Sequence, residues 1–127
     1  MPDKQLFEYA VIRVVPKVER EEFINVGVIL YSREQKFLKL LFQLDEQKLR
    51  CLTNDIDIGE VKDHLHAIER ICEGEAGSGP IGQMDIASRF RWLTATRSTV
   101  VQASKVHPGI CNSPGEAIHK LFSELVL

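Results

Sequence analysis

A chain of 127 residues with 44% hydrophobic and 27% charged residues is expected to form one soluble globular domain, residues 1–127, with a core of its own. Its formal net charge of −2 argues against wholesale electrostatic binding of nucleic acid, and its three widely spaced cysteines favour free thiols over a disulfide framework. No apolar run approaches the ~20 residues of a membrane span and no secretory signal opens the sequence, so a cytoplasmic location is expected.

The first third of the chain has the composition of β-strands. Segments 6–15, 23–32 and 37–44 are rich in β-branched and aromatic residues, and short polar turns separate them, which favours an antiparallel meander. The continuous apolar character of the first segment indicates burial on both faces over part of its length. Gly27 inside the second segment indicates a bulge or a close backbone approach.

Helix signals follow. Residues 45–52 have the composition of one or two helical turns. Asp57 and Glu60 are spaced as a capping box that opens a helix to about Glu73, and Gly74 fits the position just beyond its end. This part of the chain therefore predicts a helix of about four turns.

The last part of the chain alternates between loop, helix and strand signals. Residues 73–83 are a glycine-rich loop by composition, and Asp85 is placed to cap a short helix through about Leu93. A fourth strand is expected at 97–104, and the capping box at 113–116 opens a closing helix. The order β-β-β-α-α-β-α predicts an α+β fold, with helices packed on one face of a mostly antiparallel sheet of about four strands.

One segment is unusual in its charge. Residues 1–84 carry 11 Lys/Arg and 15 Asp/Glu, whereas residues 85–127 carry five and three, and no carboxylate lies between Ile86 and Gly115. Guanidinium groups bind phosphate and carboxylate through two parallel hydrogen bonds, and tryptophan offers a stacking surface. The candidate residues for binding an anion or a partner in this arginine stretch, residues 89–102, are Arg89, Arg91, Trp92, Arg97, Ser98 and Gln102.

Two geometries are open for this stretch. If residues 86–93 are helical, Arg89 lies beside the buried face and Arg91 points nearly opposite, into solvent. If they are extended, Arg89 and Arg91 share one face. The alternative to an anion site is that Trp92 is part of the core while the arginines pair with the acidic turn at 17–22.

Arg13 is a second candidate, because it lies among apolar residues in the first strand. A buried arginine needs a partner, and Glu22 or Glu8 could provide one. We therefore expect a paired polar cluster, formed by Arg13, Glu19, Glu22 and Asn25.

Other chemistry has little support, and no metal, cofactor or catalytic residue is expected. His107 and Cys111 are four residues apart, but Pro108 and Gly109 predict a loop there and no second pair completes a metal site. The same pair is the one candidate for a cysteine nucleophile with a base.

The segments YAVIRVVPKVEREEFINVGVILYS (9–32) and RFRWLTATRSTVVQASKVHPGIC (89–111) resemble the bacterial family known as domain of unknown function 3037. The resemblance brings no established activity. It implies a partner or accessory role beside a kinase-like protein of the HipA type. It also implies that Glu19, Glu22 and Asn25 meet the arginines of the 89–102 stretch across one edge of the fold.

We therefore expect a non-catalytic interaction or accessory module whose partner is a protein, with the HipA-like kinase as the first candidate. The alternative is a binder of a phosphorylated ligand, nucleotide or nucleic acid through the arginine stretch. A homodimer is a further expectation, because small α+β domains with exposed strand edges commonly associate. An enzyme that uses Arg and Glu side chains is the third hypothesis.

Overall fold

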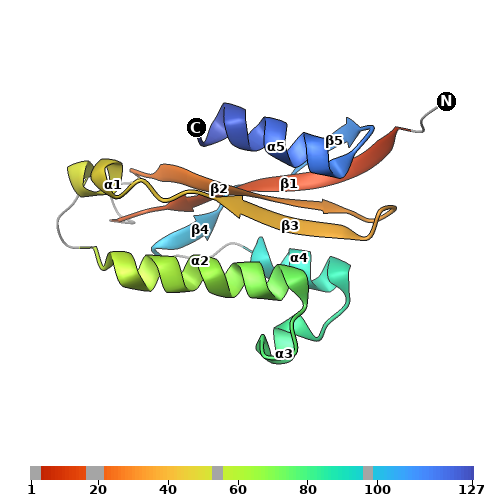
Figure 1. Cartoon of the computed structure of the whole chain (residues 1–127), viewed down its shortest axis with the longest axis horizontal. Helices are drawn as coiled ribbons and strands as arrows, with labels where there is room; N and C mark the ends of the chain where they lie inside the picture. The colour runs from red at the N-terminus through yellow and green to blue at the C-terminus, as the bar shows by residue number, and fades with distance from the viewer. Residues whose placement is uncertain (1–3, 17–21, 53–55, 96–98) are drawn as a thin grey trace.

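The computed structural model describes residues 4–16, 22–52, 56–95 and 99–127. Within these ranges the α+β class is confirmed, with one antiparallel sheet and helices packed against it (Figure 1). The strands are β1 (Gln5–Val14), β2 (Ile24–Ser32), β3 (Phe37–Phe42), β4 (Val101–Ala103) and β5 (His107–Cys111). The helices are α1 (Glu46–Leu52), α2 (Ile58–Glu73), α3 (Gly79–Gly82), α4 (Ile86–Leu93) and α5 (Pro114–Leu125).

The sheet is slightly larger than the four strands expected, with the order β3-β2-β1-β4 and with β5 also paired to β1. β4 and β5 share one edge of β1: β4 pairs with residues 12–14 and β5 with residues 5–9. Ser104 continues the pairing between them, because its hydroxyl accepts a hydrogen bond from the Val11 amide (2.8 Å) and its own amide donates to the Val11 carbonyl (2.8 Å).

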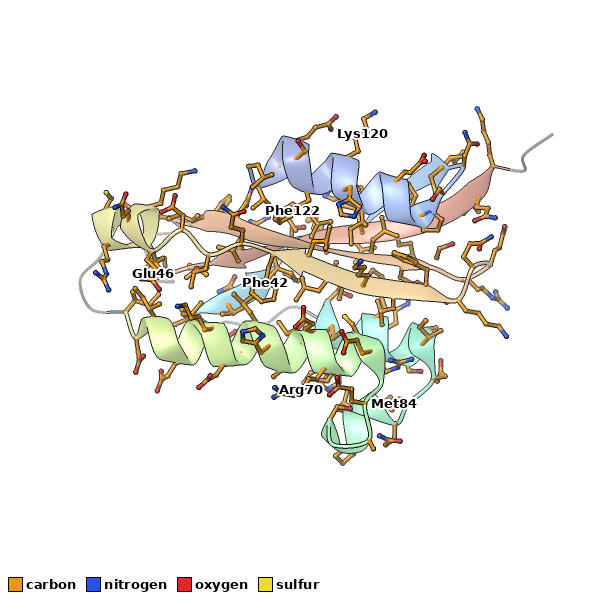
Figure 2. The ribbon with its side chains drawn as sticks, viewed as in Figure 1. Phe42, Glu46, Arg70, Met84, Lys120 and Phe122 are labelled. Atoms are coloured by element: carbon orange, nitrogen blue, oxygen red, sulfur yellow. The ribbon has the colours of Figure 1, made fainter. Side chains whose placement is uncertain are left out.

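Helices cover both faces of the sheet, so the expectation of one covered face is wrong (Figure 1). Ile12 packs in a core with α2 and α4, whereas Phe7 packs in a second core with α5. Figure 2 labels one residue of each core: Phe42 lies on the side of the sheet that faces α2, and Phe122 of α5 lies in the core on the opposite side. Successive side chains of a strand point to opposite faces, so a strand that is apolar on both faces needs a helix layer on each. The predicted two-sided burial of β1 is confirmed.

Gly27 has both features that the sequence indicated. The register between β1 and β2 shifts here, because Ile12 pairs with Gly27 while Arg13 pairs with Asn25. A Cβ atom on Gly27 would lie 2.8 Å from the carbonyl oxygen of Leu41 on β3. The register leaves Val26 unpaired, so the bulge lies directly beside the close backbone approach at Gly27.

The predicted helix ends are also found. Asp57 accepts a hydrogen bond from the Glu60 amide (3.1 Å), and Gly74 ends α2 with a left-handed φ of 69°. Ser113 caps α5 in the same way. Among the described residues, no helix combines the length and the apolar character that crossing a membrane requires.

The segment 107–111 is a strand, so the loop expected there is wrong. Proline is tolerated because β5 lies at the edge of the sheet, where a missing N–H costs no ladder hydrogen bond. Gly109 is needed because a Cβ at this position would overlap the ring of Phe7 on β1. The glycine-rich loop also holds a short helix, α3, that composition did not indicate.

Candidate binding groove

Helix α4 determines how the arginine stretch is arranged. Asp85 begins it by accepting hydrogen bonds from the Ser88 hydroxyl (2.6 Å) and amide (3.1 Å), and these bonds hold the pKa of the Asp85 carboxyl below its ordinary value. Phe90 and Leu93 are buried on the inner face. The helical alternative is therefore the one found, and Arg89 and Arg91 leave α4 in different directions.

Arg89 caps the end of α2. Its Nη1 donates to the carbonyl oxygens of Ile71 (2.8 Å) and Cys72 (2.9 Å), which belong to the last turn of that helix. The positive charge also lies at the negative end of the helix dipole. A Cβ on Gly74 would lie 2.9 Å from Nη1, so the glycine makes room for the guanidinium.

Arg91 forms an ion pair with Glu8 of β1, with 3.0 Å between Nη1 and Oε1. The pair is partly exposed, so it contributes only about 0.2–1 kcal/mol to stability. An arginine has five N–H donors, and one of them is used here. Arg91 therefore keeps donors that can reach a ligand.

Arg89 and Arg91 line the same surface hollow even though they leave the helix differently. This hollow, which we call the α4 groove, has a volume of about 930 Å³ and lies between the first half of α4, the start of β1 and the turn after β2. Four cations and two carboxylates line it: Arg33, Lys36, Arg89, Arg91, Glu8 and Asp85. Its apolar lining residues are Leu6, Phe7, Tyr31, Ile86 and Ala87.

Arg33 and Lys36 are not among the predicted site residues, because the segment between the second and third predicted strands has the composition of a polar turn. Lys36 adopts a left-handed φ of 51° and its amide donates to the Arg33 carbonyl (3.2 Å), which closes the turn. Neither side chain forms an ion pair with a carboxylate of the described residues. The predicted antiparallel meander could have indicated these two residues, because its second turn must lie beside the start of the first strand.

The remaining candidates of the arginine stretch lie elsewhere. Trp92 is 41% exposed and lines a separate small hollow with Gln102. The side-chain amide of Gln102 donates to the Thr99 carbonyl (2.7 Å). Arg97 and Ser98 lie outside the described residues. Of the four candidates that the structure describes, the two arginines on α4 line the α4 groove, whereas Trp92 and Gln102 do not.

Arg13 and Asn25 are direct neighbours across β1 and β2. The Arg13 guanidinium lies 4.1 Å from the ring centroid of Phe23, and the Asn25 amide donates to the carbonyl of Leu125 (3.1 Å) at the end of α5. This arrangement satisfies a helix end and stacks a cation on an aromatic ring.

The acidic members of the predicted cluster are Glu19 and Glu22. Glu22 is exposed and precedes β2, and Glu19 lies outside the described residues. Asn25 lies beside Arg13 and donates to Leu125, so it does not meet Arg89 or Arg91 of α4. Glu8 and Arg13 are five positions apart on β1, and an odd separation turns two side chains to opposite faces.

Neither Cys72 nor Cys111 has the lowered pKa that is typical of a nucleophilic thiol. Burial raises the pKa of the Cys72 thiol to about 12, and burial also raises the pKa of Cys111. His107 lies four residues from Cys111 on an extended strand, a separation of about 13 Å, so the two cannot act as a pair. Within the described ranges, no group of three or more His, Cys, Asp or Glu residues could hold a metal ion.

Comparison with known proteins gives one match. The model of the family described as Protein of unknown function (DUF3037) matches residues 9–126. The search of curated proteins and the search of solved structures found no match. Because the family model spans nearly all of the 127 residues, the chain belongs to the DUF3037 family.

Proposed function

We propose that this protein is a non-catalytic interaction module that binds a partner protein through the α4 groove. The observation that carries the proposal is the composition of the groove: four cations and two carboxylates surround an apolar lining. Binding surfaces on proteins typically combine apolar and aromatic contacts with arginine at their centre. Burial raises the pKa of the Cys72 and Cys111 thiols, which favours neither of the two as a nucleophile.

Among the four cations of the groove, Arg33 and Lys36 support the binding of a partner more strongly than Arg89 and Arg91 do. Arg89 is engaged by the end of α2 and Arg91 by Glu8, whereas Arg33 and Lys36 have no carboxylate partner among the described residues. A partner that brings carboxylates to this turn would gain charge complementarity, which speeds association and selects the partner. The HipA-like kinase suggested by the family resemblance is the first partner to test.

The test is co-expression of the protein with a kinase of the HipA type, the partner that the family resemblance implies, followed by affinity purification and size-exclusion chromatography. The variant Arg33→Glu/Lys36→Glu reverses the charge of the two groove cations that have no carboxylate partner among the described residues. The control is Lys120→Glu, an exposed change on the outer side of α5, across the sheet from the groove (Figure 2). We expect a complex with the wild type and the control and at least a tenfold weaker one with the double variant. Equal binding by all three proteins would refute the groove as the interface.

A phosphorylated small ligand is the second candidate, and the two groove cations Arg33 and Lys36 favour it. Calorimetric titration with a nucleoside triphosphate and with a phosphoserine peptide tests this function, at about 50 and 200 mM salt, where phosphate contacts weaken. Binding that falls with salt and is lost in Arg33→Glu/Lys36→Glu would support it. The absence of heat at millimolar ligand would exclude it.

A further inference from the structure

We infer that the occupant of the α4 groove is an acidic amphipathic helix of the partner protein, which lies across the uncovered end of the sheet. This inference rests on the proposed function and names the chemistry of the partner. Its basis is an apolar surface that continues from the groove onto β5, together with the charge of the turn beside it.

The apolar surface is a pair of side chains. Leu6 on β1 and Ile110 on β5 are cross-strand neighbours, with 64% and 63% of their surface exposed. Cross-strand neighbours lie on the same face of a sheet. Leu6 lines the α4 groove, so the pair extends its apolar lining to the edge of the sheet.

Within the described ranges of the chain, no helix covers one end of this face. Along β1 the side chains on the side of α2 and α4 are Leu6, Glu8, Ala10, Ile12 and Val14. Their exposed fractions are 0%, 1% and 0% at Ala10, Ile12 and Val14, but Leu6 is 64% exposed. Cover by the helices of this chain therefore ends between Ala10 and Leu6. An apolar sheet face is normally buried against another element, and here a partner would supply that element.

The form of the sheet favours a helix over an added strand. Strand addition needs a free row of N–H groups at an edge, and Pro108 removes one from β5. A helix satisfies its own backbone hydrogen bonds and can place an apolar stripe on the exposed pair. Pro108 also argues against association of two copies through their β5 edges.

The charges determine which helix fits. Arg33 and Lys36 line the groove without carboxylate partners among the described residues, and Leu6 of the apolar pair lines the same groove. The expected ligand therefore has apolar residues at positions i, i+4 and i+7 and carboxylates along the neighbouring stripe. A basic amphipathic helix would be repelled.

The experiment uses three labelled synthetic peptides of about 18 residues, a helix of about 27 Å. The first has leucine at i, i+4, i+7 and i+11 with glutamates beside them. The second replaces each glutamate by lysine, and the third replaces each leucine by serine. We expect the first peptide to bind in fluorescence anisotropy and to gain helical circular dichroism on binding. The other two should bind at least about tenfold more weakly.

The protein variants locate the contact. Leu6→Ser/Ile110→Ser should weaken binding of the first peptide at least about tenfold, because two large apolar contacts are lost. Arg33→Glu/Lys36→Glu should do the same, and Lys120→Glu should leave affinity unchanged. Both serine changes are at exposed positions, and an unchanged midpoint of urea unfolding checks that each variant is folded.

Three results would overturn the inference. Equal binding of the serine peptide would show that the groove recognises charge alone. Binding of the first peptide without a gain of helicity would exclude the helix. Light scattering could also detect a dimer of the wild type that Leu6→Ser/Ile110→Ser converts to a monomer. That result would assign the apolar pair to contact with a second copy of the chain.

Failure of this inference is separable from failure of the proposed function. If the kinase complex depends on Arg33 and Lys36 but no peptide binds, the interaction module stands and the acidic helix is refuted. If the groove variants change the affinity for neither the kinase nor the peptides, the proposed function itself is refuted.

Discussion

Replacing Arg89 by alanine removes the two hydrogen bonds, of 2.8 and 2.9 Å, that Nη1 donates to the carbonyl oxygens of Ile71 and Cys72. A hydrogen bond that involves a charged group contributes about 1.5–3 kcal/mol. A cation at a helix C-terminus adds about 0.3–1 kcal/mol. Because Arg89 is only half-buried and water can replace part of the lost contact, we expect the free energy of unfolding to fall by about 2 kcal/mol.

Urea unfolding followed by circular dichroism measures this loss, with thermal unfolding as a second readout. For a chain of this length, about 2 kcal/mol corresponds to a fall in Tm of roughly 6–10 °C. The matched control is Arg91→Ala, which removes a partly exposed ion pair and should cost no more than about 1 kcal/mol. Arg89→Lys should lie between the two, because an ammonium keeps the charge but lacks the planar fork.

The reasoning is refuted if Arg89→Ala and Arg91→Ala lower the free energy of unfolding equally, within about 0.5 kcal/mol. That result would mean that the end of α2 does not depend on the guanidinium of Arg89. A loss confined to low salt would also contradict it, since hydrogen bonds at a half-buried helix end are screened less than exposed ion pairs.

The other predictions concern local features of the fold. Gly109→Ala should lower stability by about 1–3 kcal/mol, because the new methyl group meets an aromatic ring, whereas Gly77→Ala, which has open space around it, should cost less than about 0.5 kcal/mol in the same urea assay. At pH 8 a thiol reagent should label the exposed Cys51 promptly, whereas the buried Cys72, whose pKa is raised to about 12, should be labelled only on unfolding. Peptide mass spectrometry measures both labelling rates, and equal rates would contradict the burial of Cys72. Asp85→Ala should lower Tm more at pH 7 than at pH 3. The ionised carboxylate stabilises the fold at pH values above its ordinary pKa of 3.8, and this stabilisation is lost as the pH falls through the lowered pKa of the folded state. A Tm difference that does not change with pH would contradict it.

Local features were predictable wherever the deciding interaction lies within a few residues of the chain. Asp57, Asp85 and Ser113 each cap a helix by accepting a hydrogen bond from the amide three residues later, so short-range spacing is enough to predict where the helices begin. Gly27 was informative for a similar reason, since glycine within an apolar strand indicates a contact that a side chain would block.

Edge strand β5 shows where local rules fail. Pro108 and Gly109 predict a loop when the neighbours are unknown, yet both fit an edge strand that crosses the ring of Phe7. The number of covered faces was missed in the same way. Amphipathic spacing shows which stripe of α5 is buried, but it carries no information about which face of the sheet receives that stripe.

By itself, the sequence determined the class of the fold, the helix starts, the bulge at Gly27 and the helical or extended options for the arginine stretch. Only the tertiary structure decided that Arg89 caps α2, that Arg91 pairs with Glu8, and that both line a groove with Arg33 and Lys36. The physical reason is range. Caps and turns depend on bonds between near neighbours, whereas the groove joins residues 6–8, 31–36 and 85–91, and their meeting depends on the packing of α4 against the sheet.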